Sequence, residues 1–205
     1  MSKRTLLTAA LLCLALAPAA AAGLSKSYSY FTIGGVTVEE IERELNVRGP
    51  KVRSTGSRHP GATHMEFKSR IKYGMRNDRC AVVDARVTVD ARIILPRWNK
   101  RSKADDDVRL IWDTLSADIK RHEESHVVIA KNHARELEIA LKAIAPQRDC
   151  ATAEARAAAV TDQVLAKHDA EQQRFDRVEG INFESRLLRL LRYRMERIDA
   201  GTLAE

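Results

Sequence analysis

Two histidines four residues apart, with a glutamate directly after the first, have the spacing in this chain best suited to chemistry. They lie in the segment His122-Glu123-Glu124-Ser125-His126. On a helix, residues i and i+4 share a face with Cβ atoms about 6 Å apart, so both imidazoles can reach one ion. Zinc binds neutral imidazole nitrogen, and the adjacent glutamate of such a motif acts as general base toward water. The spacing predicts that His122 and His126 bind Zn2+ and that Glu123 is the catalytic base.

A chance occurrence of this pattern on a charged helix is the alternative interpretation, because short motifs carry a false-positive risk. Three features favour the zinc site. The segment is predicted to be helical, and its histidines fall on the apolar stripe that runs from Val108 to Ile144. The start of the chain also indicates export, and zinc peptidases are common outside the cytoplasm.

A catalytic zinc needs a third protein ligand and an open coordination position. His133 lies on the same face but about 10 Å further along the helix axis, and no glycine intervenes to turn the chain back, so we expect it in a supporting or core position. The third ligand should come from the following helix. Glu179, next to Gly180, is the favoured residue, with His168 and Asp176 as alternatives. A solvated helix face is the remaining interpretation of all three.

The first 22 residues have the pattern of a secretory signal peptide, to which we assign residues 1–22. Lys3 and Arg4 form a positive start, an apolar run extends from Leu6 to Ala17, and an alanine-rich cleavage site ends at Ala22. The apolar run is short for a membrane span, although an uncleaved anchor is the alternative. We predict a periplasmic or secreted protein without stable membrane insertion after cleavage.

Two cysteines, Cys80 and Cys150, remain after the predicted cleavage. Two cysteines in an oxidising compartment suffice for one disulfide, so we predict that they pair. A loop of about 70 residues closed in this way would stabilise the fold by roughly 4 kcal/mol in the chain-entropy model. Two buried free thiols are the alternative.

The composition fits a folded protein without a nucleic-acid partner. Hydrophobic residues make up 44% and charged residues 31% of the chain, which argues against disorder. The formal charge of the whole chain is +7, and an excess of positive charge suits an anionic envelope surface. There is no zinc-finger spacing, no RNP motif and no dense basic run with aromatics between its members, so we expect no nucleic-acid binding.

The predicted elements define one α+β domain over residues 23–205, with a strand-rich part up to residue 101 and a helical part from residue 102. Apolar and polar residues alternate most clearly between Cys80 and Leu95, as in a sheet with one solvated face. The remaining predictions are strands at 27–33 and 63–73, a hairpin connection at 74–78, a helix at 37–45 and a loop at 48–62. In the helical part we predict one long helix from a Ser102–Asp105 capping box to Pro146, then helices at 151–178 and 183–199. The predicted architecture is a small antiparallel sheet packed on the long histidine-bearing helix, followed by two further helices.

Several segments outside the histidine motif add to a family resemblance. They are the Tyr28-Ser29-Tyr30 start, Gly34-Gly35, the strand from Cys80 to Leu95-Pro96-Arg97-Trp98, and the helix after Cys150. With the motif, they resemble a family of bacterial proteins of unknown function described as predicted secreted zinc-dependent proteases. The resemblance covers nearly all of the predicted mature chain. It implies zinc binding at His122 and His126 and a base at Glu123.

The end of the second predicted helix departs from the pattern of that family. Members place a Tyr-Asp and then a His-Gly there, whereas this chain has Phe175-Asp176 and then Val178-Glu179-Gly180. The departure is compatible with Glu179 in the place of a histidine ligand.

Motif and resemblance together predict a secreted zinc metallopeptidase, a hydrolase that cleaves peptide bonds of a peptide or protein substrate, including cell-envelope proteins. His133 and Tyr193 are candidates for stabilising the oxyanion. The alternatives are a non-catalytic exported envelope protein with a structural zinc site, and a zinc amidase acting on peptidoglycan. An open fourth coordination position would distinguish an enzyme from a structural site, and activity on casein against muropeptides would distinguish the two enzymes.

Overall fold

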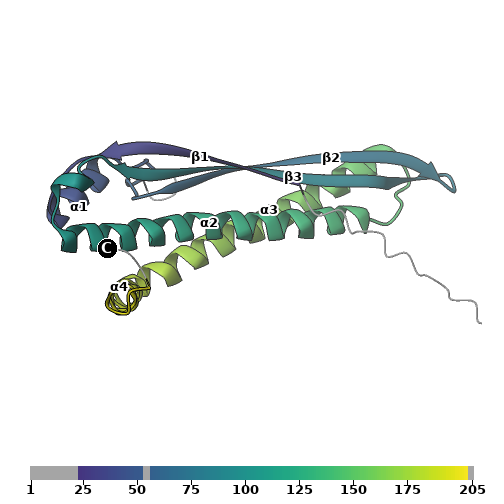
Figure 1. Ribbon diagram of the computed structural model, residues 1–205. Helices are drawn as coiled ribbons and strands as arrows, with labels where there is room; N and C mark the ends of the chain where they lie inside the picture. The colour runs from purple at the N-terminus through teal and green to yellow at the C-terminus, as the bar shows by residue number, and fades with distance from the viewer. Residues whose placement is uncertain (1–22, 53–55, 203–205) are drawn as a thin grey trace, which may run out of the picture.

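The computed structural model describes residues 23–52 and 56–202. One face of a three-stranded sheet lies along a long helix, a short helix closes one end, and two further helices continue the chain behind and then below the long one (Figure 1). The predicted α+β class is confirmed. The signal peptide predicted for residues 1–22 lies outside the described residues.

The sheet is mixed, so the predicted antiparallel sheet is wrong for one strand pair. Its strands are β1 (Gly23–Ile33), β2 (Ala62–Arg76) and β3 (Arg79–Trp98), in the order β1-β3-β2. β2 and β3 form an antiparallel hairpin, whereas β1 runs parallel to β3. Alternation of apolar and polar residues tells which face of a strand is buried, but it does not tell which strands are neighbours.

The turn of the hairpin is tighter than the predicted connection at 74–78. Asn77 and Asp78 alone connect the two strands, and both have positive φ, 48° and 60°. Two-residue hairpin loops favour this conformation because its twist matches that of the strands, and Asn and Asp tolerate it better than other non-glycine residues. The hairpin therefore continues the sheet past both predicted strand limits.

The predicted helices are confirmed, the last with the predicted bounds and the other three with shifted ends. They are α1 (Val38–Arg48), α2 (Asp106–Lys142), α3 (Cys150–Ile181) and α4 (Phe183–Asp199). The predicted Ser102–Asp105 capping box is wrong: Ser102 lies in a short 3-10 helix (Arg101–Lys103), and Asp105 is the N-cap without a side-chain hydrogen bond. A real capping box begins α1, where Thr37 and Glu40 bond reciprocally.

The main core lies between the inner face of the sheet and α2. Alternate residues of β3, among them Ala85, Val87 and Val89, are almost fully buried against α2. Their partners from the helices are Ala130, Ala134, Leu137, Leu141, Ala157 and Val164. The alanines leave room for the sheet and α3 to approach α2 closely, which a helix with large side chains on every side would prevent.

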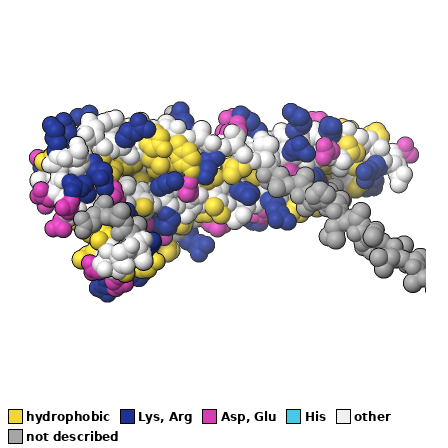
Figure 2. All heavy atoms as spheres, viewed as in Figure 1, with side chains coloured by type: hydrophobic (Ala, Val, Ile, Leu, Met, Phe, Trp, Pro, Cys, Tyr) yellow, Lys and Arg dark blue, Asp and Glu magenta, His cyan; other side chains and the backbone are white. Residues whose placement is uncertain are grey.

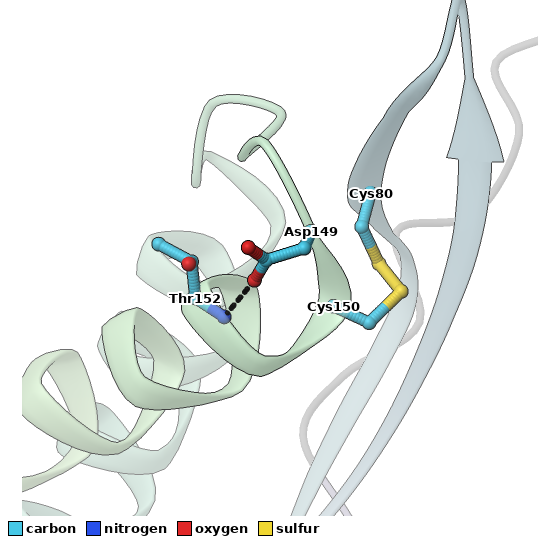
Figure 3. The surroundings of a disulfide bond; sticks show 4 residues. All are labelled: Cys80, Asp149, Cys150 and Thr152. Carbon is cyan, nitrogen blue, oxygen red and sulfur yellow. Dashed lines mark hydrogen bonds between the residues drawn. A yellow bond between two sulfur atoms is a disulfide. The ribbon is translucent and has the colours of Figure 1, made fainter.

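α3 returns antiparallel to α2, crosses behind it and emerges below it (Figure 1). Its first residue, Cys150, forms the predicted disulfide with Cys80 at the start of β3 (Figure 3). Asp149 caps the same helix end by accepting from the backbone N–H of Thr152 at 2.7 Å. The disulfide is consistent with an exported protein.

The surface carries mixed charge. On the face drawn in Figure 2, Lys and Arg side chains are spread along the molecule with Asp and Glu among them. Within residues 23–52 and 56–202, no helix combines the length and the apolar character needed to cross a membrane.

Candidate metal centre

α2 brings the two histidines of the motif together on its side facing α3. The Nε2 atoms of His122 and His126 lie 3.1 Å apart, as the i, i+4 spacing predicts. Both rings are partly buried, with side-chain exposures of 27% and 12%. Two ring nitrogens at this distance lie close enough to bind one cation.

Asp176, from α3, completes a group of three converging donors. Its Oδ1 lies 3.1 Å from Nε2 of His126 and 3.4 Å from Nε2 of His122. Ligand atoms at about 2.0–2.1 Å from a tetrahedral zinc lie about 3.4 Å from one another, so the residues fit such an ion. Within the described part of the chain, these three form the one group of His, Cys, Asp and Glu side chains that is close enough to hold a metal.

The members of this group also affect one another's pKa strongly. Burial by itself raises the pKa of Asp176, but its hydrogen bonds with the two imidazoles outweigh burial and hold the pKa far below its usual range. Burial lowers the pKa of His126, and the contacts with Asp176 and Gln172 reverse this to a net rise. A positive charge is therefore favoured at the point where the two imidazoles meet the carboxylate of Asp176.

Glu179, the predicted third ligand, lies on the other side of His122. Its Oε2 is 3.6 Å from Nδ1 of His122, the ring nitrogen that faces away from Asp176. Arg121 donates to the same carboxylate oxygen, and Arg186 of α4 lies 3.3 Å from it. The structure thus places Asp176, and not Glu179, against both Nε2 atoms, because the two arginines hold Glu179 at the back of the His122 ring.

Those arginines belong to an ion-pair network that joins three helices. Asp118 of α2, whose side chain is 3% exposed, accepts from Arg121 at 2.9 Å and from Arg186 at 3.1 Å. Burial by itself raises the pKa of Asp118, but the two guanidinium groups outweigh it and keep the pKa below its usual value. The network fixes Glu179 and ties α4 to the candidate metal centre.

Glu123 points from α2 toward the start of β2. It is only 5% exposed, and its Oε2 accepts from the hydroxyl of Thr63 at 2.8 Å. Gly61 lies so close that a Cβ on it would be 2.7 Å from Glu123 Oε1, so a larger residue here would displace the Glu123 carboxylate. Burial raises the pKa of Glu123, and the bond from Thr63 offsets the rise only in part. A raised pKa suits a carboxylate that must take up and release a proton.

Gln172 of α3 contacts the second histidine. Its Oε1 lies 2.6 Å from Nδ1 of His126, opposite the nitrogen that faces Asp176. The sequence prediction missed Gln172 and Thr63. Gln172 could have been found, since it lies one helical turn before Asp176 and so shares its face. Thr63 gave no such signal, because its contact with Glu123 depends on the packing of β2 on α2.

An aromatic ring and an open groove lie beside the candidate ligands. Phe175 stacks on His122 at 5.0 Å between ring centroids and meets His126 edge-on at 5.1 Å. The same phenylalanine lines a groove of about 400 Å³ between α2 and α3. The other lining residues are Ser125, Val128, Ile129, Glu171, Arg174 and Val178. The groove gives a mainly apolar surface next to the candidate centre.

The remaining candidates from the sequence lie elsewhere. His133 is buried, with its two ring nitrogens against Glu136 at 3.0 Å and Glu171 at 2.9 Å, as expected of a core histidine. His168 is also buried, but it contacts Phe67 and Gln172 and is not one of the three converging donors. Tyr193 is exposed on α4.

One family model matches the chain. It is described as "Bacterial protein of unknown function (DUF922)" and covers residues 28–184, a range that includes every residue of the candidate centre and ends just inside α4. The comparisons with curated proteins and with solved structures gave no match.

Proposed function

The chain belongs to the DUF922 family of bacterial proteins of unknown function, and on that premise we propose that it is an exported zinc-dependent peptidase. The observation that carries the proposal is the convergence of His122, His126 and Asp176 beside a buried glutamate, Glu123. Two imidazoles and one carboxylate are a donor set typical of catalytic zinc, in which three protein ligands leave one position open.

In this proposal His122, His126 and Asp176 hold the ion. Asp176 takes the place that the sequence favoured for Glu179, because its oxygen lies within 3.4 Å of both Nε2 atoms whereas Glu179 is engaged by arginines. When bound, zinc supplies a Lewis acid that polarises a carbonyl and makes water more acidic. A carboxylate third ligand leaves the centre with a net charge of about +1.

The proton transfers fall to Glu123. Its carboxylate accepts a proton from the attacking water and returns it to the leaving amide nitrogen, so that the peptide bond breaks with atoms and charge in balance. The hydroxyl of Thr63 donates to Oε2 of Glu123 and so orients the carboxylate. Because Gly61 has no side chain, the chain at the start of β2 can pass close to the Glu123 carboxylate.

Glu123 favours an enzyme over a structural zinc site. A structural site needs ligands alone and is closed by a fourth protein ligand, whereas here three donors converge and a fourth carboxylate with a raised pKa lies next to them without joining them. The apolar groove beside Phe175 suits the side chain of a peptide or protein substrate. A zinc amidase acting on peptidoglycan would use the same residues and remains the second candidate, separated from a peptidase by its substrate.

Zinc content is the first test. The mature protein, purified after chelation and reconstituted with Zn2+, should hold one zinc by native mass spectrometry. Asp176→Ala and His126→Ala should lose it, and Asp169→Ala, an exposed carboxylate on the same helix, should keep it. Glu179→Ala should bind zinc about 10–100-fold more weakly, as expected for a group behind a ligand. Loss of zinc with Glu179→Ala but not with Asp176→Ala would reverse the ligand assignment.

Hydrolysis is the second test. The zinc-loaded protein should cleave casein and should leave muropeptides intact, and the cleavage should disappear on chelation. Cleavage of muropeptides alone would favour the amidase. A stoichiometric, tightly held zinc without activity on either substrate would favour a structural site.

A further inference from the structure

The tip of the β2–β3 hairpin extends past the ends of α2 and α3 (Figure 1). Residues 70–86, here called the hairpin end, are joined to the helical part by the Cys80–Cys150 disulfide and by two backbone hydrogen bonds between Cys80 and Gln147. The hairpin end contains five Lys and Arg residues and two Asp residues, so its net charge is +3. Its cations are Arg70, Lys72, Arg76, Arg79 and Arg86. This end of the molecule is therefore basic.

Arginines lie opposite arginines within the hairpin end. Arg70 is the cross-strand partner of Arg86, and Arg76 is the cross-strand partner of Arg79. All four residues are exposed, and Arg86 lies on the outer face of the sheet because its neighbours in β3 are buried against the helices. Like charges directly opposite one another destabilise a sheet. Two such pairs bring no benefit to the fold, and they suit an anionic partner outside the chain.

The part of the outer face nearer the start of β2 has its charge paired. There, Lys68 lies 2.6 Å from a carboxylate oxygen of Asp90 and 3.4 Å from one of Glu66. Within residues 23–52 and 56–202, by contrast, no carboxylate forms an ion pair with Arg70 or Arg86. Their guanidinium groups are available to bind phosphate oxygens, whose geometry matches the planar guanidinium fork.

Two exposed apolar side chains accompany these cations. Met75 is 64% exposed close to the turn, and Val83 is 43% exposed beside the register shift between Lys72 and Tyr73. Cations around exposed apolar side chains are suited to the surface of an anionic bilayer, because the charges attract the headgroups while the apolar groups enter the interface. A soluble polyanion would use the cations and gain little from Met75.

We propose that the hairpin end binds the surface of an anionic phospholipid bilayer. The guanidinium groups contact the lipid phosphates, and Met75 enters the interface. The candidate metal centre stays clear of the bilayer, since His126 lies about 24 Å before the end of α2 at Lys142, at about 1.5 Å per residue. This surface role is independent of the proposed function, because the hairpin end contains no residue of the metal centre.

Cosedimentation of the mature protein with vesicles measures the binding. Vesicles made of equal parts of phosphatidylcholine and phosphatidylglycerol should bind the protein, less tightly as salt is added, and vesicles of phosphatidylcholine alone should not. Arg70→Gln combined with Arg86→Gln should weaken binding about 30-fold, because each Lys or Arg near an anionic bilayer contributes about fivefold. Met75→Ser should weaken it a few-fold.

Arg189→Gln combined with Arg192→Gln is the matched control. It removes the same charge from exposed positions of α4 and should leave the affinity for the mixed vesicles unchanged. Far-UV circular dichroism and the urea midpoint show that each variant is folded. No binding to the mixed vesicles, equal binding to phosphatidylcholine alone, or equal losses in the two double variants would overturn the proposal. Unchanged binding of Met75→Ser, with equally tight binding of the parent to soluble polyphosphate, would overturn it in favour of a soluble polyanion.

Discussion

The α2–α3 pair has two halves that differ in what they bury. The disulfide half comprises α2 from Ala134 to Lys142 and α3 from Cys150 to Val164, and the histidine half comprises α2 from Asp118 to His133 and α3 from His168 to Glu179. Leu137 and Leu141 of the disulfide half are fully buried against the sheet and α3. Between α2 and α3, the histidine half places imidazoles, carboxylates and an amide that bond to one another.

This difference indicates that the two halves of the helix pair contribute differently to stability and to the candidate site. Apolar burial stabilises a fold at about 25 cal/mol per Å², whereas buried polar groups cost free energy unless each one has a partner. In the described part of the chain no buried side-chain nitrogen or oxygen lacks a hydrogen-bond partner. The polar groups of the histidine half therefore have hydrogen-bond partners, but their burial adds little to the stability of the fold. We infer that the disulfide half holds α2 and α3 together and that the histidine half carries the chemistry.

The largest effect should come from the histidine half and should appear in activity rather than in stability. Glu123→Gln should reduce peptide hydrolysis about 10²–10⁴-fold, because the amide cannot accept the proton, while zinc stays bound. Initial rates on casein, with zinc content measured in parallel, test this. Glu124→Gln, one residue along on the helix, is the control and should keep most of the rate. Full activity in Glu123→Gln would exclude this site as the source of the hydrolysis.

The next largest effect should come from the covalent link of the disulfide half. Replacing both Cys80 and Cys150 by serine should lower the free energy of unfolding by roughly 4 kcal/mol, since the bond closes a loop over a sequence separation of 70. Urea unfolding of the oxidised parent and of the double variant measures the difference. A change below about 1 kcal/mol would show that apolar packing alone holds this half together.

A single core leucine should matter nearly as much. Leu137→Ala should destabilise the protein by about 3 kcal/mol, because it removes a fully buried side chain and leaves a cavity between α2, α3 and the sheet. Ile139→Ala, two residues away and 59% exposed, is the matched control and should cost far less. Thermal and urea unfolding compare the two. Similar losses at both positions would contradict the assignment of this half as the stabilising core.

The smallest effect should be the pH dependence from the ion-pair network of the histidine half. The pKa of Asp118 is lower in the folded protein than in the unfolded chain, so its contribution to stability is present above the usual aspartate pKa and is lost as the pH falls through the folded value. Asp118→Asn should therefore cost about 2 kcal/mol at pH 7 and progressively less below about pH 4.

Urea unfolding at several pH values checks this, with Asp162→Asn on the exposed face of α3 as the control. A difference between the parent and Asp118→Asn that stays constant down to pH 2 would show that the carboxylate contributes nothing through its charge.

The sequence by itself determined the elements and one half of the site. Sequence patterns located the four α-helices and the three strands of the described residues, because apolar spacing of 3.6 or 2 residues reflects burial on one side of an element. On the predicted helix, the i, i+4 spacing placed His122 and His126 on one face with Glu123 beside the first, since that relation is local. Two cysteines, with no others in the predicted mature chain, determined the pairing of Cys80 with Cys150.

Only the tertiary structure decided which residues meet across elements. β1 lies parallel to β3, Asp176 rather than Glu179 faces the two Nε2 atoms, and Thr63 reaches Glu123 from β2. Each of these depends on how two elements rotate and slide against one another, and a shift of one residue along a helix turns a side chain by about 100°. Arg186 illustrates the point: it comes from α4, far from the motif in the sequence, and helps to hold Glu179 behind the ring of His122.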